Sequence, residues 1–386
     1  MTMTPRERFL AACRRAPVDR IPFDLGGRVT DIAATLYNPY RRHLGLPEIQ
    51  RPDWPEDSHH SRLGVATLDD DFLELLEVDT RWISFLPPTS HDHRFKLEPD
   101  GSATYVDEWG ANLKRVVGQP YFNFVEQPLL KATNIQEINA HPWPKMDGSR
   151  DDYWGKTVEH HKSRGDYALC FVFKGIFEQT WPLRGLEQSM KDMIKNPDLL
   201  EALMDKVLES QINLYGRMAD VIGKDLDMVL ITDDYCGQQL PMFSIKNFRR
   251  FILPRQLEMY KVLRAKGVKV SGFHSDGAVF DFIPGFIDMG MEVLNPIQIT
   301  ASGMEAEKVK EAYGSQIAFW GGMDTQDLLP NADPETVYSE ISKVITTLAR
   351  NDGYIFASIH NVQGDTPLEN LLAAFRAFKD LRDQKF

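Results

Sequence analysis

Cysteine is scarce in this chain of 386 residues, which contains only Cys13, Cys170 and Cys236. The three lie far apart and form no CxxC pair, which argues against a disulfide framework and against a cysteine-rich zinc site. Because sparse, unpaired cysteines are typical of a reducing compartment, we expect a cytoplasmic protein.

Long apolar runs are absent as well. No stretch approaches the roughly 20 apolar residues that a membrane-spanning helix needs. The opening residues, MTMTPRERFLAACRR, place charge on both sides of a short apolar patch and lack the apolar core of a signal peptide. We therefore expect no association with a membrane.

The chain also lacks basic runs and phosphate-binding glycine motifs. Its formal net charge is −12, which argues against a general nucleic-acid binder. Neither GxGxxG nor GxxxxGKS/T occurs, and the pairs Gly26-Gly27 and Gly321-Gly322 predict tight strand–loop turns instead. The composition, 42% hydrophobic and 26% charged, is that of a globular protein with a large core.

Apolar runs separated by amphipathic helical stretches dominate the chain from residue 167 onward. The runs are YALCFVF (167–173), DMVLITDD (227–234), VKVSGF (268–273), MEVLNP (291–296), IAFWGG (317–322) and YIFASI (354–359). Strands that alternate with helices predict βα units and a parallel sheet. Adding IPFDL and WISF gives about eight strands, the number that closes a (β/α)8 TIM barrel. A doubly wound open sheet is the alternative.

Three other segments complete the expected organisation. Two alternating runs around Asp100-Gly101 predict a β-hairpin, inserted in an excursion near residues 91–150. A polar stretch over 47–62 predicts a loop, and His160-His161 lies in a polar stretch that we expect to be solvated. Because no interdomain linker is evident, we expect a single barrel domain over residues 1–386.

The active site of a (β/α)8 barrel lies at the carboxyl ends of its strands, so the polar residues there are the candidates. The candidates for substrate binding are Asp24, Arg28, Lys174, Asn295, Gln298 and Gln363. Arg28 follows two glycines and would hold a substrate carboxylate or form a structural ion pair.

His274 and Asp276 follow the VKVSGF run, two residues apart. Side chains at i and i+2 of an extended chain point to the same side, so the two can face one point. With His360 at another strand end, they would offer two imidazoles and a carboxylate to a divalent metal, with one position left open. The alternatives are a hydrogen-bonded pocket lining, or a general base, His274, that Asp276 orients.

Asp233 and Asp234 form a second candidate cluster. Adjacent residues of a strand point to opposite faces, so at most one of the two should enter the pocket directly. That carboxylate would act as a proton donor or as a metal ligand. The alternatives are a helix cap and a salt bridge.

A set of motifs resembles those of a known superfamily. It contains, in this order, ERFLAACRRAPVDRIPFDLGG, EWGANLKRV, DDYCGQQLPMFS, HSDGAV, LNPIQ, FWGGMDTQDLLP and HNVQGDTPLENLLAAF. These segments resemble the uroporphyrinogen decarboxylase superfamily. The resemblance implies a (β/α)8 barrel and a homodimer. It also implies one of two activities: cofactor-free decarboxylation of a haem precursor, or zinc-dependent methyl transfer between small substrates or thiols and corrinoid proteins.

Two departures favour the methyltransferase-like branch. The decarboxylases carry Arg-Gln-Ala-Gly-Arg after the first strand, whereas this chain has Asp24-Leu25-Gly26-Gly27-Arg28, with an aspartate in place of the first arginine. The methyltransferases carry His-x-Cys after the fifth strand and a later cysteine before Thr-Pro. Here HSD and HNVQGDTP place His274, Asp276 and His360 at or near those ligand positions.

The sequence therefore predicts a metal-dependent methyltransferase, with zinc as the expected ion. It would move a methyl group between a small O-, N- or S-methyl substrate and a corrinoid (cobalamin) carried by a partner protein. Asp233 or Asp234 would protonate the leaving group, and Gln298 and Gln363 would orient the substrate. One alternative is a cofactor-independent decarboxylase of a porphyrinogen or small carboxylic acid, in which Arg28 holds a carboxylate. The other is a barrel that binds a ligand or a corrinoid protein without chemistry.

Overall fold

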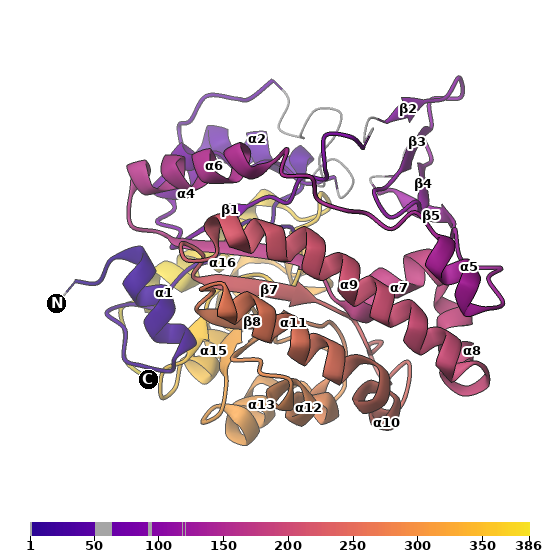
Figure 1. Cartoon of the computed structure of the whole chain (residues 1–386). Coiled ribbons are helices and arrows are strands. Elements are labelled where there is room, and N and C mark those ends of the chain that lie inside the picture. Colours follow the sequence, from indigo (N-terminus) through magenta and orange to yellow (C-terminus); the bar gives the residue numbers. More distant parts are fainter. Residues whose placement is uncertain (1, 51–63, 92–94, 118, 120) are drawn as a thin grey trace.

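The computed structural model describes residues 2–50, 64–91, 95–117, 119 and 121–386 (Figure 1). Most of the loop predicted over 47–62 lies outside them. The helices are α1 (Pro5–Cys13), α2 (Ala34–His43), α4 (Asp70–Leu75), α5 (Ile135–Ala140), α6 (Asp151–Arg164), α7 (Ile176–Arg184), α8 (Leu186–Lys195), α9 (Pro197–Ile222), α10 (Ile245–Asn247), the π-helix η1 (Phe248–Ile252), α11 (Leu253–Ala265), the 3-10 helix η2 (Phe280–Phe282), α12 (Ile283–Asp288), α13 (Ala306–Tyr313), α14 (Leu328–Asn331), α15 (Pro334–Leu348) and α16 (Leu368–Leu381). The strands are β1 (Thr80–Ile83), β2 (Lys96–Leu97), β3 (Ala103–Val106), β4 (Asn112–Arg115), β5 (Asn123–Glu126), β6 (Ala168–Lys174), β7 (Met228–Thr232), β8 (Val270–His274), β9 (Val293–Asn295), β10 (Ala318–Trp320) and β11 (Tyr354–Ile355). Within the described ranges, no helix combines the length and apolar character needed to cross a membrane.

A parallel sheet of seven strands forms the centre of the fold. Its order, β1-β6-β7-β8-β9-β10-β11, follows the chain, and helices connect most consecutive strands. All the pairings are parallel, as the alternation of apolar runs and helices predicted. The six runs from residue 167 onward each overlap one of the strands β6 to β11.

The predicted first strand, IPFDL, is a short bridging segment between the two outer strands of this sheet. Phe23 forms a parallel bridge with Phe356, just beyond β11, and the Asp24 N–H donates to the Phe356 carbonyl at 3.0 Å. On its other side, the Asp79 N–H donates to the Phe23 carbonyl at 2.8 Å, one residue before β1. The sheet therefore curls, as in a TIM barrel, until one segment contacts both of its edges.

The two faces of the curled sheet carry alternate residues of each strand. Cys170 and Val172 of β6 face a small inner cluster, to which α1 contributes Phe9. Leu169 and Phe171 face the larger cluster that includes the surrounding helices. This alternation is the period of two that a strand imposes, and it decides below which polar residues reach the inside of the sheet.

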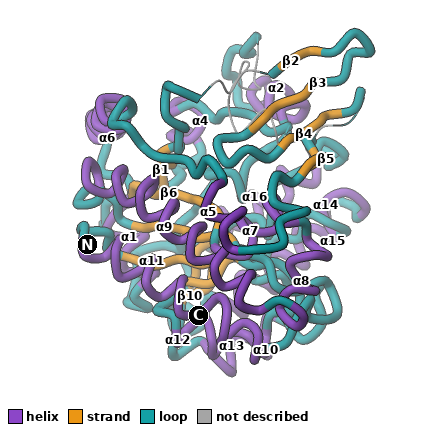
Figure 2. The backbone as a smooth tube through the Cα atoms, turned by 45° about the vertical axis from the view of Figure 1, so that its right-hand side comes forward, coloured by secondary structure: helices purple, strands orange, loops and turns teal. Residues whose placement is uncertain are grey.

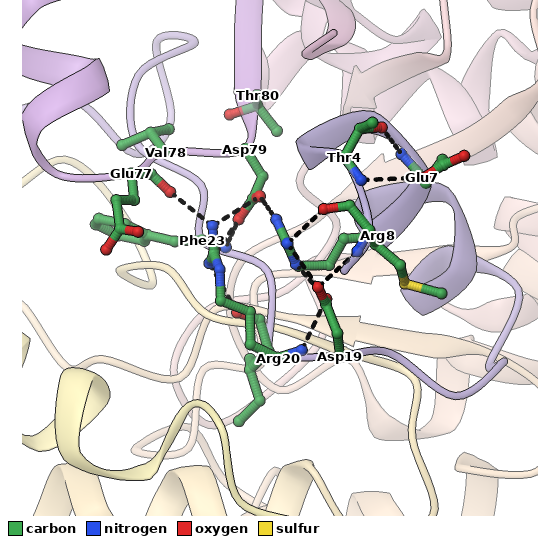
Figure 3. Close-up of polar contacts among 12 residues, drawn as sticks. Thr4, Glu7, Arg8, Asp19, Arg20, Phe23, Glu77, Val78, Asp79 and Thr80 are labelled. Atoms are coloured by element: carbon green, nitrogen blue, oxygen red, sulfur yellow. Dashed lines mark hydrogen bonds and ion pairs between the residues drawn. The ribbon is translucent and has the colours of Figure 1, made fainter. Parts of the chain in front are cut away.

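Helix α1 covers the inner cluster and is held by buried ion pairs (Figure 3). The helix begins with a capping box, in which the side chains of Thr4 and Glu7 accept hydrogen bonds from each other's backbone N–H groups. Arg8 of this helix lies 2.5 Å from Asp79 and 2.6 Å from Asp19, and Arg20 approaches Asp79 at 3.0 Å. Asp79 thus joins α1 to the residues just before β1.

An antiparallel sheet of four strands, β2-β3-β4-β5, stands apart from the parallel sheet, at the upper right in Figure 2. It lies inside the excursion predicted near 91–150. Around Asp100-Gly101, Lys96 of β2 pairs with Thr104 of β3, where a hairpin was expected. Two further strands extend this pair, so the excursion contains a larger sheet than the predicted hairpin.

Candidate functional site

Four polar residues form one row at the carboxyl edge of the parallel sheet. Lys174 pairs in register with Thr232, Thr232 with His274, and His274 with Asn295. Each has the same parity as the inward-facing residues of its strand, so the row faces the inside of the curled sheet. This edge is where a barrel places its active site.

His274, the last residue of β8, is oriented by its neighbour in the row. Its Nδ1 lies 2.5 Å from Asn295 Oδ1, and since an amide oxygen only accepts hydrogen bonds, Nδ1 carries the proton. Nε2 is then the nitrogen with the lone pair whenever the ring is neutral. That nitrogen lies 3.7 Å from Asp276 Oδ2.

His360 completes a cluster with His274 and Asp276. The two imidazole rings lie 6.0 Å apart, centroid to centroid. One ligand atom of each of the three residues lies within 4.8 Å of the others. Two imidazoles and a carboxylate suit zinc and related divalent ions, and the hydrogen bond from His274 to Asn295 is the kind of support that metal-bound histidines have. The donor set therefore fits a divalent metal.

The charges around this cluster are mostly negative. Burial raises the pKa of Asp234, and the nearby Asp276 carboxylate raises it further, to about 7. Burial opposes a charge on His274, but the carboxylates of Asp276 and Asp234 outweigh it and raise the pKa of His274 to about 9. Burial lowers the pKa of His360. The two carboxylates thus create a local field that stabilises a cation.

The structure separates the two predicted acids, Asp233 and Asp234. Asp233 is fully buried and caps the start of α7, because its oxygens accept N–H bonds from Phe177 at 3.0 Å and Glu178 at 2.6 Å. The Tyr235 hydroxyl donates to it as well, at 2.8 Å. Asp234 points the other way, lines the pocket, and accepts the Asp276 N–H at 2.7 Å. Alternation predicted that at most one of the pair would enter the pocket, and the packing of α7 on Asp233 leaves that place to Asp234.

A pocket of about 230 Å³ opens above the row and contains His274, His360 and Asp234 in its lining. The antiparallel sheet and its neighbouring turns supply much of its wall. The aromatic residues in the lining are Phe85, Trp109, Phe122, Phe124, Phe173 and Tyr215. The pocket therefore combines aromatic side chains with charged and polar groups, as small-molecule sites commonly do.

Arg28 and Lys174, both predicted to bind substrate, line this pocket. Arg28 has a positive φ of 72° after the two glycines, and its backbone is tied to the loop after β11 by a 2.9 Å bond from Asn361. The Lys174 ammonium lies 5.0 Å from the centroid of the Phe124 ring and 4.0 Å from Glu178. Both cations are thus held at the pocket wall.

Three predicted amide residues support the site from outside the pocket lining. Asn295 orients His274. Gln298 accepts the Gly277 N–H at 2.6 Å and so holds the turn that follows Asp276. Gln363 bonds Tyr121, and so joins the segment before β5 to the loop after His360. Their contacts indicate positioning roles for the loops that carry the cluster.

Asp24 does not reach the pocket. It is fully buried on the bridging segment, where it lies 2.5 Å from the Thr80 hydroxyl, 2.8 Å from the Thr30 hydroxyl and 2.9 Å from the Trp82 indole nitrogen. Burial raises its pKa to about 6. These contacts assign Asp24 to the connection between the sheet edges.

Several acidic residues in the pocket wall were not among the candidates that the sequence indicated. Glu178 lines the pocket and accepts the Thr232 hydroxyl at 2.7 Å. Asp107, Glu108 and Trp109 enter it from the turn between β3 and β4. The motif EWGANLKRV, noted only for its resemblance, contained two of these three residues. Their position depends on how the antiparallel sheet docks, which no local pattern encodes.

Fold and site together define an α/β protein of the TIM-barrel-like class, with a pocket at the carboxyl edge of its sheet. The family profile "Uroporphyrinogen decarboxylase (URO-D)" matches residues 124–381, more than half of the chain. The chain therefore belongs to the uroporphyrinogen decarboxylase family, whose members are enzymes.

Individual relatives include both methyltransferases and decarboxylases, consistent with the methyltransferase-like branch that the motifs indicated. The methylated-thiol–coenzyme M methyltransferase of Methanosarcina mazei is 23% identical over 198 residues, 51% of this chain and 49% of that protein. The uroporphyrinogen decarboxylase of Vesicomyosocius okutanii is 25% identical over 186 residues, 47% of this chain and 50% of that protein. The chain thus matches about half the length of these two relatives.

Two similarities extend over nearly the whole chain. The uroporphyrinogen decarboxylase of Koribacter versatilis is 23% identical over 388 residues, covering 95% of this chain and 94% of that protein. The solved structure of a methyltransferase from Methanosarcina mazei superposes with a TM-score of 0.68 at 19% identity, covering 98% of this chain and 99% of that one. At this identity the structural likeness supports the fold and leaves the reaction open.

Proposed function

We propose that this protein is a metal-dependent methyltransferase that moves a methyl group between a small methylated substrate and a corrinoid protein. The observation that carries the proposal is the cluster of His274, Asp276 and His360 beside an aromatic pocket at the carboxyl edge of the sheet. We take the curled sheet with its bridging segment as a closed (β/α)8 barrel in a single domain. The similarity to a methyltransferase that acts on methylated thiols supports the reaction class.

His274, Asp276 and His360 would hold the ion, and zinc suits their donor atoms. When bound, such an ion supplies Lewis acidity, which polarises the heteroatom that carries the methyl group. Asn295 keeps the His274 ring in one tautomer, with Nδ1 protonated and Nε2 available. Gln298 and Gln363 keep the loops that follow Asp276 and His360 in place.

Asp234 is the residue that would handle the proton. It lines the pocket and lies next to the cluster, where its carboxyl group would hold a proton for the leaving group. As the methyl group leaves, the heteroatom gains an electron pair, and Asp234 would donate its proton to that atom. Asp233, buried under α7, would act only by positioning that helix.

The pocket favours a small substrate over a macrocycle with many carboxylates. Its volume is about 230 Å³, and its lining contains four carboxylates besides the basic side chains Arg28 and Lys174. Those carboxylates belong to Asp107, Glu108, Glu178 and Asp234. Aromatic walls would exclude water and hold an apolar methylated group. The decarboxylase alternative keeps support from the nearly full-length match to a uroporphyrinogen decarboxylase.

The test combines metal content with methyl transfer. We expect purified wild-type protein to bind zinc, and His274→Ala to lose one bound ion while the exposed His43→Ala variant keeps it. Wild-type protein, incubated with reduced cobalamin and a panel of methylated thiols, amines and ethers, should form methylcobalamin, and His274→Ala should not. Release of carbon dioxide from a small acid by metal-free protein, without methyl transfer, would refute the proposal and favour the decarboxylase.

A further inference from the structure

A second cluster of two imidazoles and a carboxylate lies between α4 and α6. Asp70 is the first residue of α4, and His160 and His161 lie near the end of α6. Asp70 Oδ2 is 2.6 Å from His160 Nε2, and Asp70 Oδ1 is 3.8 Å from His161 Nδ1. One ligand atom of each residue lies within 4.8 Å of the others. The cluster has the same donor types as the one at the sheet edge.

The two histidines differ in exposure, because neighbouring residues on a helix point in directions about 100° apart. The His160 side chain is 56% exposed and the His161 side chain only 14%. The expectation that both histidines are solvated is therefore wrong for His161. The arrangement gives one ligand held in the structure and one free to adjust its position.

His161 Nδ1 is a buried polar atom that has no hydrogen-bond partner among the described residues. Buried polar atoms normally have a hydrogen-bond partner. A buried nitrogen without one, next to a carboxylate and a second imidazole, therefore needs an explanation. A cation between Asp70 and His161 would provide the missing partner. A simple ion pair between Asp70 and His160 leaves the His161 nitrogen unexplained.

Arg81 fixes the carboxylate of this cluster. Its Nε donates to Asp70 Oδ1 at 3.2 Å, while its Nη1 donates to the carbonyls of Val78 at 3.2 Å and Thr80 at 2.8 Å. Metal-binding carboxylates are commonly held by such outer hydrogen bonds. The positive charge of Arg81 also lowers the affinity for a cation, so this cluster should bind metal more weakly than the sheet-edge cluster.

All three residues line a cavity of about 530 Å³. Arg28, Phe85 and Val172 line both this cavity and the candidate active-site pocket. The cavity leaves room for water molecules to complete the coordination of an ion that has three protein ligands. An ion here would also join α4 to α6 in the wall next to the pocket.

We propose that Asp70, His160 and His161 form a second divalent-metal site, with zinc or a similar late first-row ion as its occupant. Two imidazole nitrogens and one carboxylate oxygen are the donors that such ions prefer. The site lies outside the proposed catalytic cluster and does not depend on the methyl-transfer proposal.

The experiment measures zinc binding to the full-length protein by competition with a chromophoric chelator. The variants are His160→Ala, His161→Ala, His274→Ala and the control His43→Ala, which removes an exposed histidine on α2. His160 is exposed, so its replacement tests the site with little risk to folding. We expect two zinc ions on the wild type and His43→Ala, and one on each other variant. Zinc should raise the Tm of the wild type. The increase should be smaller in His160→Ala, because that variant lacks the contribution of the second site.

The outcomes separate this site from the catalytic one. If His160→Ala and His161→Ala both bind zinc with wild-type stoichiometry and affinity, the second site is refuted, whatever His274→Ala shows. If those two variants lose an ion and His274→Ala loses none, the second site stands and the metal of the proposed function is refuted. Cobalt(II) absorption bands that disappear in His160→Ala and persist in His274→Ala would confirm a separate coordination sphere.

Discussion

Asp24→Asn should stabilise this protein at neutral and alkaline pH, although it removes a buried carboxylate that contacts three hydrogen-bond donors. The reason lies in a proton count at Thr30. The Thr30 hydroxyl is 2.8 Å from Asp24 Oδ2 and 2.5 Å from the Gly26 carbonyl, yet it has one hydrogen to donate. Both contacts are satisfied when Asp24 is protonated, because Asp24 then donates to Thr30 and Thr30 donates to Gly26. An asparagine amide reproduces this pattern.

The magnitude follows from the pKa. Burial raises the pKa of Asp24 to about 6, against about 3.9 in an unfolded chain. A raised pKa means that the folded protein binds the Asp24 proton more tightly than the unfolded chain does. The protonated carboxyl group therefore contributes its full stabilisation of the fold below about pH 4, and this contribution is lost as the pH rises through about 6. Roughly two pKa units correspond to about 3 kcal/mol. The free energy of unfolding of Asp24→Asn should therefore equal that of the wild type near pH 4. Above pH 7 it should exceed the wild-type value by up to ~3 kcal/mol.

Urea unfolding of wild type and variant at several pH values measures this difference directly. Asp198, 91% exposed in the first turn of α9, provides the control, since Asp198→Asn should change the free energy of unfolding by less than about 1 kcal/mol. Burial also raises the pKa of Asp31, to about 7, and the Asp24 charge adds to that rise, so Asp24→Asn removes part of this second penalty too. An Asp24→Asn protein that is less stable at pH 8 than the wild type would refute the reasoning. It would show that Asp24 is ionised and needs its three donors.

Three further predictions concern the core and the site. Arg8→Met leaves Asp79 as a buried carboxylate with one fewer partner, so it should lower the free energy of unfolding, measured with urea, by about 3–5 kcal/mol. A change below about 1 kcal/mol would contradict the role given to this ion pair. Asn295→Ala removes the group that orients His274 and should weaken zinc binding at that cluster roughly 10- to 100-fold in chelator competition. Asp234→Asn should keep its bond from the Asp276 N–H and its zinc content, yet lower kcat by a factor on the order of 100 in methylcobalamin formation. Loss of zinc in that variant would assign Asp234 to the metal site instead.

Much of the architecture follows from periodicity alone. Apolar runs of strand length separated by amphipathic helices predicted parallel strands, because such strands require crossover connections. The capping box of α1 is a local feature as well, because Thr4, Pro5 and Glu7 lie within one helical turn. The antiparallel sheet was only partly predicted. Its last strand, β5, is short and mostly exposed, so it carries a weak apolar pattern.

The sequence by itself determined which residues could meet at the carboxyl edge of the sheet. Parallel strands end at a common edge, so residues that end or follow β8 and β11, such as His274, Asp276 and His360, could be expected to lie near one another.

Only the tertiary structure decided which of the other polar residues line the pocket and which are buried in the packing. Docking of α7 buried Asp233 and left Asp234 in the pocket, and closure of the sheet edges buried Asp24. The packing of α4 on α6 brought Asp70 to His161 across 91 positions of the chain. Such contacts depend on the relative placement of whole elements, and that placement is set by the sum of many weak packing interactions across the core.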